Sequence, residues 1–258
     1  MSDESYKPTA VTPKPAPRDM LLSLDQALTR RSSHPGPFEQ LFYAHKGRPA
    51  DKWTHYLPFY DRMLAPYRGL PVRLLEIGVC EGGSLELWRK YFGPEAVIFG
   101  IDIDPECAER ADAPNQVRIG SQADKAFLRE VVREMGGLEI VLDDGSHVAT
   151  HQRLSFEALW PLLNPGGLYV IEDLHTAYMP KWEGGLRRPG SAIELVKQLI
   201  DDMHAWYHTE DERWAGRDEI GSILIADSIV ALRKVQRRPA PGHVWVGAGT
   251  ENWGPETP

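Results

Sequence analysis

The feature that most constrains the fold of this chain is an alternation of short apolar runs with helical patterns. Five runs are apolar and end in glycine or acidic residues, as buried parallel strands do, at residues 72–78, 96–102, 116–120, 138–144 and 167–173. Between the third and fourth runs, Phe127, Leu128, Val131, Val132 and Met135 share one helix face. This order predicts an α/β, Rossmann-like fold that binds ligands at the carboxyl ends of its strands.

Two further runs, at residues 221–226 and 229–235, are separated only by Asp227 and Ser228. So short a link permits only an antiparallel hairpin. Added to the first five runs, the hairpin predicts a seven-stranded, mostly parallel sheet with an antiparallel last strand.

The rest of the chain divides by composition. Residues 1–18 are rich in Pro, Lys and small polar residues, which predicts a flexible tail. Residues 19–70 have a helical, aromatic-rich pattern and form an expected N-terminal helical cap, residues 71–236 hold the sheet, and residues 237–258 form a second tail rich in Pro and Gly.

Charge and cysteine content exclude several classes of partner. The formal net charge is −8, and no Lys/Arg block stands out, so nucleic acid is not an expected partner. No apolar run reaches the 18 or so residues of a membrane span, so no membrane is expected either. Cys80 and Cys107 are too few for a disulfide framework, and no signal-peptide pattern precedes them, so a cytoplasmic location is predicted.

The first strand runs into a glycine-rich loop. Glu76 precedes Gly78, and Gly82 and Gly83 follow before a helix begins at about Ser84. Glycines at such a turn let the backbone approach a ligand, and the helix start offers free N–H groups. The spacing is G-x-x-x-G-G rather than the G-x-G-x-x-G of dinucleotide sites, which argues against a nicotinamide dehydrogenase. The Glu76 carboxylate suits a ligand with an ammonium or sulfonium charge.

Acidic and polar residues end the next two strands. Asp102 stands where an acidic residue commonly binds the two hydroxyls of a ribose, which together with the positive charge suggests S-adenosylmethionine. Ser121 and Gln122 could meet the adenine edge. Asp124 could do so too, or could equally cap the following helix. The alternative for the whole loop is a tight turn with a solvated strand end.

Carboxylates also end the fourth and fifth strands, at Asp143, Asp144, Glu172 and Asp173. Like charges at one rim raise each other's pKa values unless a cation neutralises them, and oxygen ligands in a small cluster suit Mg²⁺. The alternative is that these carboxylates cap helices or pair with arginines. His147, on the turn after Asp144, is a candidate general base, with His151 and His175 as nearby rivals.

At this point the sequence resembles a known family. The blocks LLEIGVCEGGSLELW, DDGSHVATHQRLSFEALWPLLNPGGLYVIEDLHTAY and KGRPADKWTHYLPFYDRMLAP resemble the Mg²⁺-dependent macrolide-sugar O-methyltransferases, which are class I S-adenosylmethionine-dependent methyltransferases. The resemblance covers roughly residues 40–235, and the second block carries its most specific motifs. It implies methylation of a deoxysugar hydroxyl on a glycosylated natural product in antibiotic biosynthesis, and a homo-oligomer.

The resemblance also implies individual roles. Asp144, Glu172 and Asp173 would bind Mg²⁺, and His147 would be the general base. Glu76, Gly78, Ser84 and Asp143 would face the methionine part of the cofactor, with Asp102 on its ribose. A segment that closes over the active site is implied for His45, Lys46, Asp51, Lys52, Trp53, His55 and Tyr56, although its KGRPADKW run is two residues longer than the family's usual KGTDKW-like run. Tyr178 would begin the acceptor pocket.

Two alternative functions share these residues. A phenolic or catechol hydroxyl could replace the sugar hydroxyl, because a Mg²⁺-assisted mechanism serves it equally well. A non-catalytic protein of the same fold in an antibiotic pathway is the other alternative, but such a protein should lack an intact set of base and metal ligands.

Overall fold

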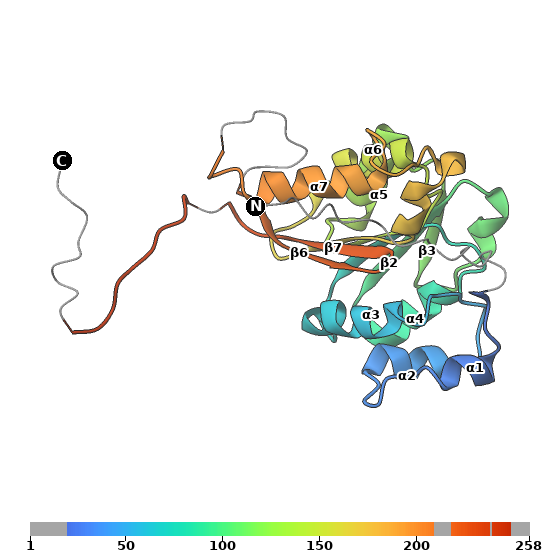
Figure 1. The fold of residues 1–258 in the computed structure, drawn as a ribbon. Helices are drawn as coiled ribbons and strands as arrows, with labels where there is room; N and C mark the ends of the chain where they lie inside the picture. The colour runs from blue at the N-terminus through green and yellow to red at the C-terminus, as the bar shows by residue number, and fades with distance from the viewer. Residues whose placement is uncertain (1–19, 209–217, 238, 249–258) are drawn as a thin grey trace, which may run out of the picture.

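One seven-stranded sheet, in the order β3-β2-β1-β4-β5-β7-β6, organises the fold (Figure 1). The computed structural model describes residues 20–208, 218–237 and 239–248. The strands are β1 (Arg73–Ile77), β2 (Val97–Asp102), β3 (Gln116–Ile119), β4 (Ile140–Asp143), β5 (Leu168–Ile171), β6 (Ile220–Ala226) and β7 (Ile229–Lys234). β1 to β5 are parallel, and β7 is antiparallel to both β5 and β6. The predicted α/β fold with an antiparallel last strand is confirmed.

Helices cover both faces of this sheet (Figure 1). One layer holds α5 (Lys125–Met135), α6 (Ala149–Leu159) and α7 (Ala192–Met203); the other holds α3 (Tyr56–Leu64) and α4 (Gly83–Phe92), with α2 (Pro37–Tyr43) and α1 (Leu24–Leu28) outside them. Short 3₁₀ helices lie in the connections: η2 (Ala65–Tyr67), η3 (Pro105–Glu109), η4 (Trp160–Leu162), η5 (Leu174–Tyr178) and η6 (Pro180–Trp182).

The alternation of side chains along β1 divides the core in two. Leu75 and Ile77 belong to the apolar cluster under α5, α6 and α7, whereas Leu74 belongs to the cluster under α3 and α4. Because successive side chains of a strand point to opposite faces, Glu76 lies on the same face as Leu74. The one charged residue of β1 that lies in the core is thereby directed toward α4, at the start of the glycine loop.

Residues before the sheet pack tightly against α4. Phe38 of α2 stacks on Trp88 at a centroid distance of 4.6 Å, and Tyr60 of α3 meets the same indole at 5.2 Å. The first turn of α2 has no side-chain cap of its own, and the Asp61 carboxylate of α3 accepts the N–H groups of Phe38 and Glu39 at 2.6 and 3.1 Å. These contacts place the residues just before α3 beside the carboxyl ends of the strands.

The predicted tails at residues 1–18 and 237–258 lie largely outside the described residues. Residues 1–18 lie outside the described residues, and of the second tail only residues 237 and 239–248 are described. The division of the chain at residues 70 and 236 stays a prediction. Within the described part of the chain, the helices are too short or too polar to cross a membrane.

Candidate active site at the carboxyl ends of the strands

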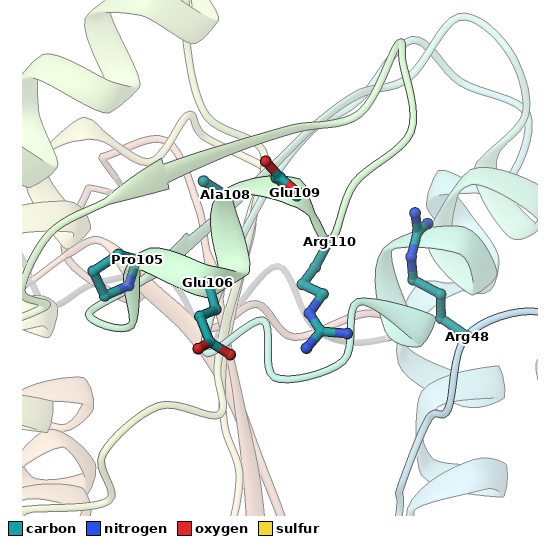
Figure 2. A pocket seen from close by; sticks show the side chains of 6 residues that line it. All are labelled: Arg48, Pro105, Glu106, Ala108, Glu109 and Arg110. Atoms are coloured by element: carbon teal, nitrogen blue, oxygen red, sulfur yellow. The ribbon is translucent and has the colours of Figure 1, made fainter.

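A cavity of about 1410 Å³ opens at the carboxyl ends of the parallel strands. Many of the predicted site residues line it: Gly78, Ser84, Asp102, Ser121, Gln122, Asp144, His147, Glu172 and Asp173. The wall opposite the sheet comes from residues 49–55, ahead of α3. A separate hollow of about 690 Å³ lies between Arg48 and η3 (Figure 2) and contains none of the predicted site residues.

The glycine loop is shaped by close approach of neighbouring backbone. Gly78 has a φ of +90°, and a Cβ there would lie 2.2 Å from the carbonyl oxygen of Asp144. Gly82 caps α4 with a φ of +83°, and its Cβ would lie 2.0 Å from the carbonyl oxygen of Arg110. Only glycine combines this backbone conformation with the absence of a side chain. The loop is therefore pressed against the turns that follow β4 and η3.

Glu76 lies behind the loop rather than on the wall of the cavity. Its carboxylate accepts the Ser84 hydroxyl at 2.7 Å and the Trp88 indole N–H at 3.0 Å, and 1% of the residue is exposed. Burial raises the pKa of Glu76 to about 7, although Lys52 and these two donors oppose the shift. Glu76 thus supports the start of α4, and its charge acts on the cavity through Ser84.

Asp102 joins the end of β2 to the glycine loop. One oxygen accepts the N–H groups of Val79 and Cys80 at 2.8 and 3.2 Å, and the other accepts that of Asp104 at 3.0 Å. Partial burial opposes ionisation, but these backbone donors hold the pKa of Asp102 below its ordinary value. An ionised carboxylate with remaining lone pairs faces the cavity, as hydroxyl binding requires.

The adenine side of the predicted site is occupied by internal hydrogen bonds. Gln122 donates to Asp143 at 3.1 Å and accepts the N–H of Ser146 at 2.7 Å, so its amide bridges β4 to the following turn. The Ser121 hydroxyl accepts the N–H of Ala123 at 3.2 Å. Asp124 takes the alternative role, because it caps α5 through the N–H groups of Ala126 and Phe127.

Asp143 does not reach the cavity. The residue is fully buried, and its carboxylate accepts the Ser155 hydroxyl at 2.7 Å in addition to Gln122. Burial raises its pKa. The geometry gives Asp143 a supporting position beneath Gln122, and direct contact with the cofactor stays a prediction.

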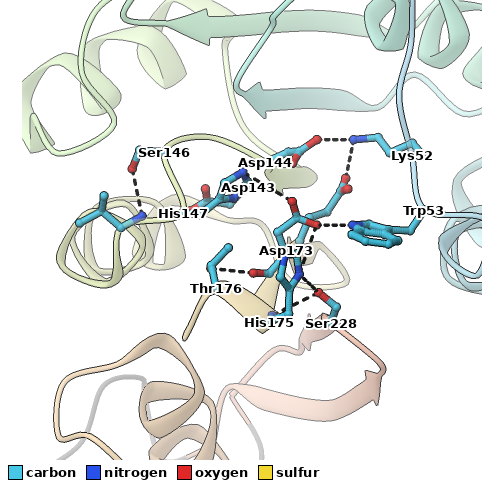
Figure 3. Close-up of polar contacts among 12 residues, drawn as sticks. Lys52, Trp53, Asp143, Asp144, Ser146, His147, Asp173, His175, Thr176 and Ser228 are labelled. Carbon is cyan, nitrogen blue, oxygen red and sulfur yellow. Dashed lines mark hydrogen bonds and ion pairs between the residues drawn. The ribbon is translucent and has the colours of Figure 1, made fainter. Parts of the chain in front are cut away.

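Three groups that suit a metal ion meet at the ends of β4 and β5. Single ligand atoms of Asp144, His147 and Asp173 all lie within 4.8 Å of one another (Figure 3). The His147 Nε2 atom is 3.6 Å from Asp173 Oδ2, and within the described part of the chain its Nδ1 is buried without a hydrogen-bond partner. His147 and Asp173 have φ values of 56° and 55°, a left-handed conformation that costs energy in residues other than glycine. Both strained residues turn their side chains toward the cavity.

Glu172 is directed away from this group of three. Its Oε1 atom lies 2.8 Å from the Lys52 Nζ atom and also accepts the Tyr60 hydroxyl, and 2% of the residue is exposed. Burial and the charge of Asp144 raise the pKa of Glu172. Burial alone would lower the pKa of Lys52, but the carboxylates of Asp144 and Glu172 raise it well above its ordinary value. Of the three predicted metal ligands, Asp144 and Asp173 thus belong to the group of three, and Glu172 is joined to Asp144 through the Lys52 ammonium.

Donors from the residues before the sheet hold Asp173 as well. The Trp53 indole N–H donates to Asp173 Oδ1 at 3.0 Å (Figure 3), and the Tyr56 hydroxyl lies 2.9 Å from the same oxygen. Sequence analysis missed Tyr60 and the roles of Lys52 and Trp53. The spacing of Tyr56 and Tyr60, one helical turn apart, was the available signal, because residues four apart share a helix face.

Other members of the predicted segment do not contact the carboxylate cluster, although Asp51 and His55 line the cavity. His45 bonds the carbonyl of Arg48 at 2.8 Å, His55 bonds the carbonyl of Asp227 at 2.9 Å, and Lys46 and Asp51 are exposed. Tyr178 is 49% exposed and is not among the residues that line the cavity. Both rival histidines line the cavity but are engaged, His151 with the Ser146 hydroxyl at 2.9 Å and His175 with the Ser228 hydroxyl at 2.6 Å.

The donor set fits a divalent cation of the Mg²⁺ type. Carboxylate oxygens are its preferred ligands, and Asp144 and Asp173 bring such oxygens within 4.8 Å of each other. Asp144 and Glu172 already converge on one cation, the Lys52 ammonium. The cavity likewise fits an extended, partly cationic ligand, since it runs from the ionised Asp102 to these carboxylates.

Comparisons with known proteins agree with this geometry. Residues 75–174 match a family model described as a methyltransferase domain. The chain is 38% identical over 220 residues to the 8-demethyl-8-(2-methoxy-alpha-L-rhamnosyl)-tetracenomycin-C 3'-O-methyltransferase of Streptomyces olivaceus, covering 81% of this chain and 54% of that protein. It is 43% identical over 161 residues to the mycinamicin VI 2''-O-methyltransferase of Micromonospora griseorubida, covering 57% and 39%.

A solved structure also shares the fold. A methyltransferase of the mycinamycin biosynthetic pathway, determined with Mg and SAH, matches with a TM-score of 0.67 and 33% identity over 76% of this chain and 54% of that chain. The class I methyltransferase fold and the resemblance to antibiotic-sugar O-methyltransferases are thus confirmed. The chain spans about half the length of the curated relatives that it matches.

Proposed function

We propose that this chain, which carries a methyltransferase domain and is related to the sugar O-methyltransferases of antibiotic pathways, transfers a methyl group from S-adenosylmethionine to a deoxysugar hydroxyl with the help of Mg²⁺. One observation carries the proposal. A single cavity joins Asp102 at the end of β2 to the cluster of Asp144, His147 and Asp173. The names of the relatives support a glycosylated natural product as the acceptor.

Bound together, S-adenosylmethionine would supply a methyl group on a cationic sulfur, and Mg²⁺ would supply a Lewis acid that lowers the pKa of a hydroxyl. Asp102 would hold the ribose, and the glycine loop and Ser84 the methionine part. Asp144, Glu172 and Asp173 would hold the ion. The Oε1 atom of Glu172 could join this set only by giving up its present contact with Lys52.

His147 is the group placed to remove the acceptor proton. Its Nε2 atom faces the Asp173 carboxylate at 3.6 Å, so a hydroxyl held between the carboxylates and the imidazole would pass its proton to Nε2. Asp173 would then stabilise the imidazolium. The rivals His151 and His175 already bond serine hydroxyls. The role of these residues in catalysis is alignment and charge stabilisation.

A calorimetric titration of S-adenosylmethionine, run once with Mg²⁺ and once with a chelator, followed by a methyl-transfer assay on glycosylated antibiotics and catechols, tests the proposal. We expect one-site binding, and turnover of sugar acceptors only in Mg²⁺. Turnover of catechols alone would move the acceptor to the phenolic alternative. Cofactor binding with no turnover of any acceptor would support a non-catalytic partner, and an absence of binding would refute the proposal.

A homo-oligomer and a cytoplasmic location belong to the same proposal. Light scattering on the purified chain measures the first. A monomer at assay concentration, with full activity, would remove the oligomer from the proposal without affecting the chemistry.

A further inference from the structure

Lys52 is a buried cation in the centre of the carboxylate cluster. Its side chain is 4% exposed, and its Nζ atom bonds both an oxygen of Asp144 and Oε1 of Glu172 (Figure 3). These carboxylates follow the neighbouring strands β4 and β5. A buried ammonium that two carboxylates share offsets one of their two negative charges and so reduces their mutual repulsion.

A divalent ion bound by Asp144 Oδ2 and Glu172 Oε1 would need the two oxygens that Lys52 bonds. The Lys52 Nζ atom is within hydrogen-bond distance of both oxygens, so the ammonium stands where an ion shared by them would stand. Two cations in contact with the same oxygens would also repel each other strongly in a buried site. Lys52 in its observed position and a metal ion on these two oxygens are therefore mutually exclusive.

We propose that Lys52 is a positioning residue, a resident cation that holds Asp144 and Glu172 until a divalent ion replaces it. This inference rests on the proposed function, because it takes these carboxylates as metal ligands. Ion binding would expel the ammonium and shift residues 51 and 52, which line the cavity. Binding of the ion would therefore change the shape of the cavity wall.

The surroundings of Lys52 allow such a shift. Residues 49–52 have neither helical nor strand structure, and anchors lie on both sides of them. On one side, Arg48 bonds Glu86 of α4 at 3.2 Å and Asp112 at 2.7 Å. On the other, the Trp53 indole N–H donates to Asp173 Oδ1 at 3.0 Å and the Tyr56 hydroxyl lies 2.9 Å from the same oxygen. The short stretch between the anchors can move while both of its ends stay attached.

Two measurements test the inference on the full chain. The first is calorimetric titration of Mg²⁺ and Mn²⁺ into wild type, Lys52→Met and Lys46→Met. Methionine keeps most of the length of lysine without the charge, and Lys46 is an exposed lysine of the same segment. We expect the ion to bind Lys52→Met at least about tenfold more tightly, a difference of about 1.4 kcal/mol, and Lys46→Met like wild type. Mere structural damage would weaken binding instead.

The second measurement needs no variant and remains valid if Lys52→Met fails to fold. Amide hydrogen exchange of residues 49–55 is followed in wild type with Mg²⁺ and with a chelator. We expect exchange there to change on ion addition while that of α5 does not. Equal or weaker ion affinity in Lys52→Met, or unchanged exchange on saturation with ion, would overturn the inference and leave the proposed function standing. An absence of ion binding in both proteins would overturn both.

Discussion

Asp102 and Asp173 end two strands of the same sheet, yet they are held in opposite ways. Asp102 is held mainly by backbone N–H groups, those of Val79, Cys80 and Asp104, with the Cys107 thiol as a side-chain partner. Asp173 is bound by the side chains of Trp53 and Tyr56, which lie 120 and 117 residues earlier in the chain. Backbone donors exist whatever the side chains are, whereas the second arrangement depends on particular residues of a distant segment. The cofactor half of the site is thus local, and the carboxylate half is assembled at long range.

The largest expected effect on activity comes from a substitution in the carboxylate half of the site alone. His147→Asn should lower turnover about 100-fold or more, because it removes the proposed general base. Asparagine tolerates the left-handed backbone at this position, so the fold should persist. Methyl transfer measures the first effect and calorimetry shows whether S-adenosylmethionine affinity is kept. His151→Asn is the matched control and should stay near wild type. Loss of cofactor binding by the His147 variant, with turnover per bound cofactor unchanged, would contradict the role.

The next largest effect comes from a substitution in the cofactor half of the site alone. Asp102→Asn replaces a charged acceptor of three N–H groups by an amide, and S-adenosylmethionine affinity should fall about 10- to 100-fold. Ion affinity should not change, since Asp102 is not in the metal cluster. Titrations of S-adenosylmethionine and of Mg²⁺ measure the two affinities. Asp104→Asn, the same substitution two residues away, is the matched control. A parallel loss of ion affinity would show that the two halves are not independent.

The pH dependence of the free energy of unfolding tests the buried carboxylate of Glu76, which lies behind the cofactor side of the site. Its folded-state pKa of about 7 lies above the ordinary value of 4.5, so its contribution to stability is full below pH 4.5 and is lost as pH rises through 7. The free energy of unfolding of wild type minus that of Glu76→Gln should therefore fall by up to about 3 kcal/mol between pH 4 and pH 8. Denaturant unfolding of both proteins at the two pH values measures it. A difference that is constant with pH would show that folding does not shift the pKa of Glu76.

The smallest expected effect concerns the support of Glu172. Tyr60→Phe removes a hydroxyl donor to this buried carboxylate and should cost about 1 kcal/mol of unfolding free energy. Tyr91→Phe is the control, because the Tyr91 hydroxyl is buried without a hydrogen-bond partner among the described residues. Thermal unfolding of both variants gives the comparison. Equal losses would mean that the Tyr60 hydroxyl contributes nothing specific to Glu172.

Sequence patterns predicted the sheet because each strand carries its own signal. Apolar runs with turn residues at both ends identified all seven strands within two residues of their observed bounds, and Asp227-Ser228 identified the hairpin. The meeting of Asp144, His147 and Asp173 was also predictable, since the carboxyl ends of parallel neighbours emerge at the same edge. Two of the predicted site residues, Glu76 and Asp143, lie behind the cavity wall, because strand periodicity and the packing of α4 and α6 decide which way a side chain points.

The amino-acid sequence by itself determined the order of strands and helices, the glycine loop and the identity of the acidic strand ends. These depend on short-range periodicity and on backbone conformations that few residues adopt. Only the tertiary structure decided that Lys52 joins Asp144 to Glu172, that Tyr60 bonds Glu172 Oε1, and that Trp53 and Tyr56 bond Asp173 Oδ1. Such contacts span more than 90 positions of the chain. They form only when the packing of α3 against α4 brings a distant segment to the end of the sheet, which no local pattern encodes.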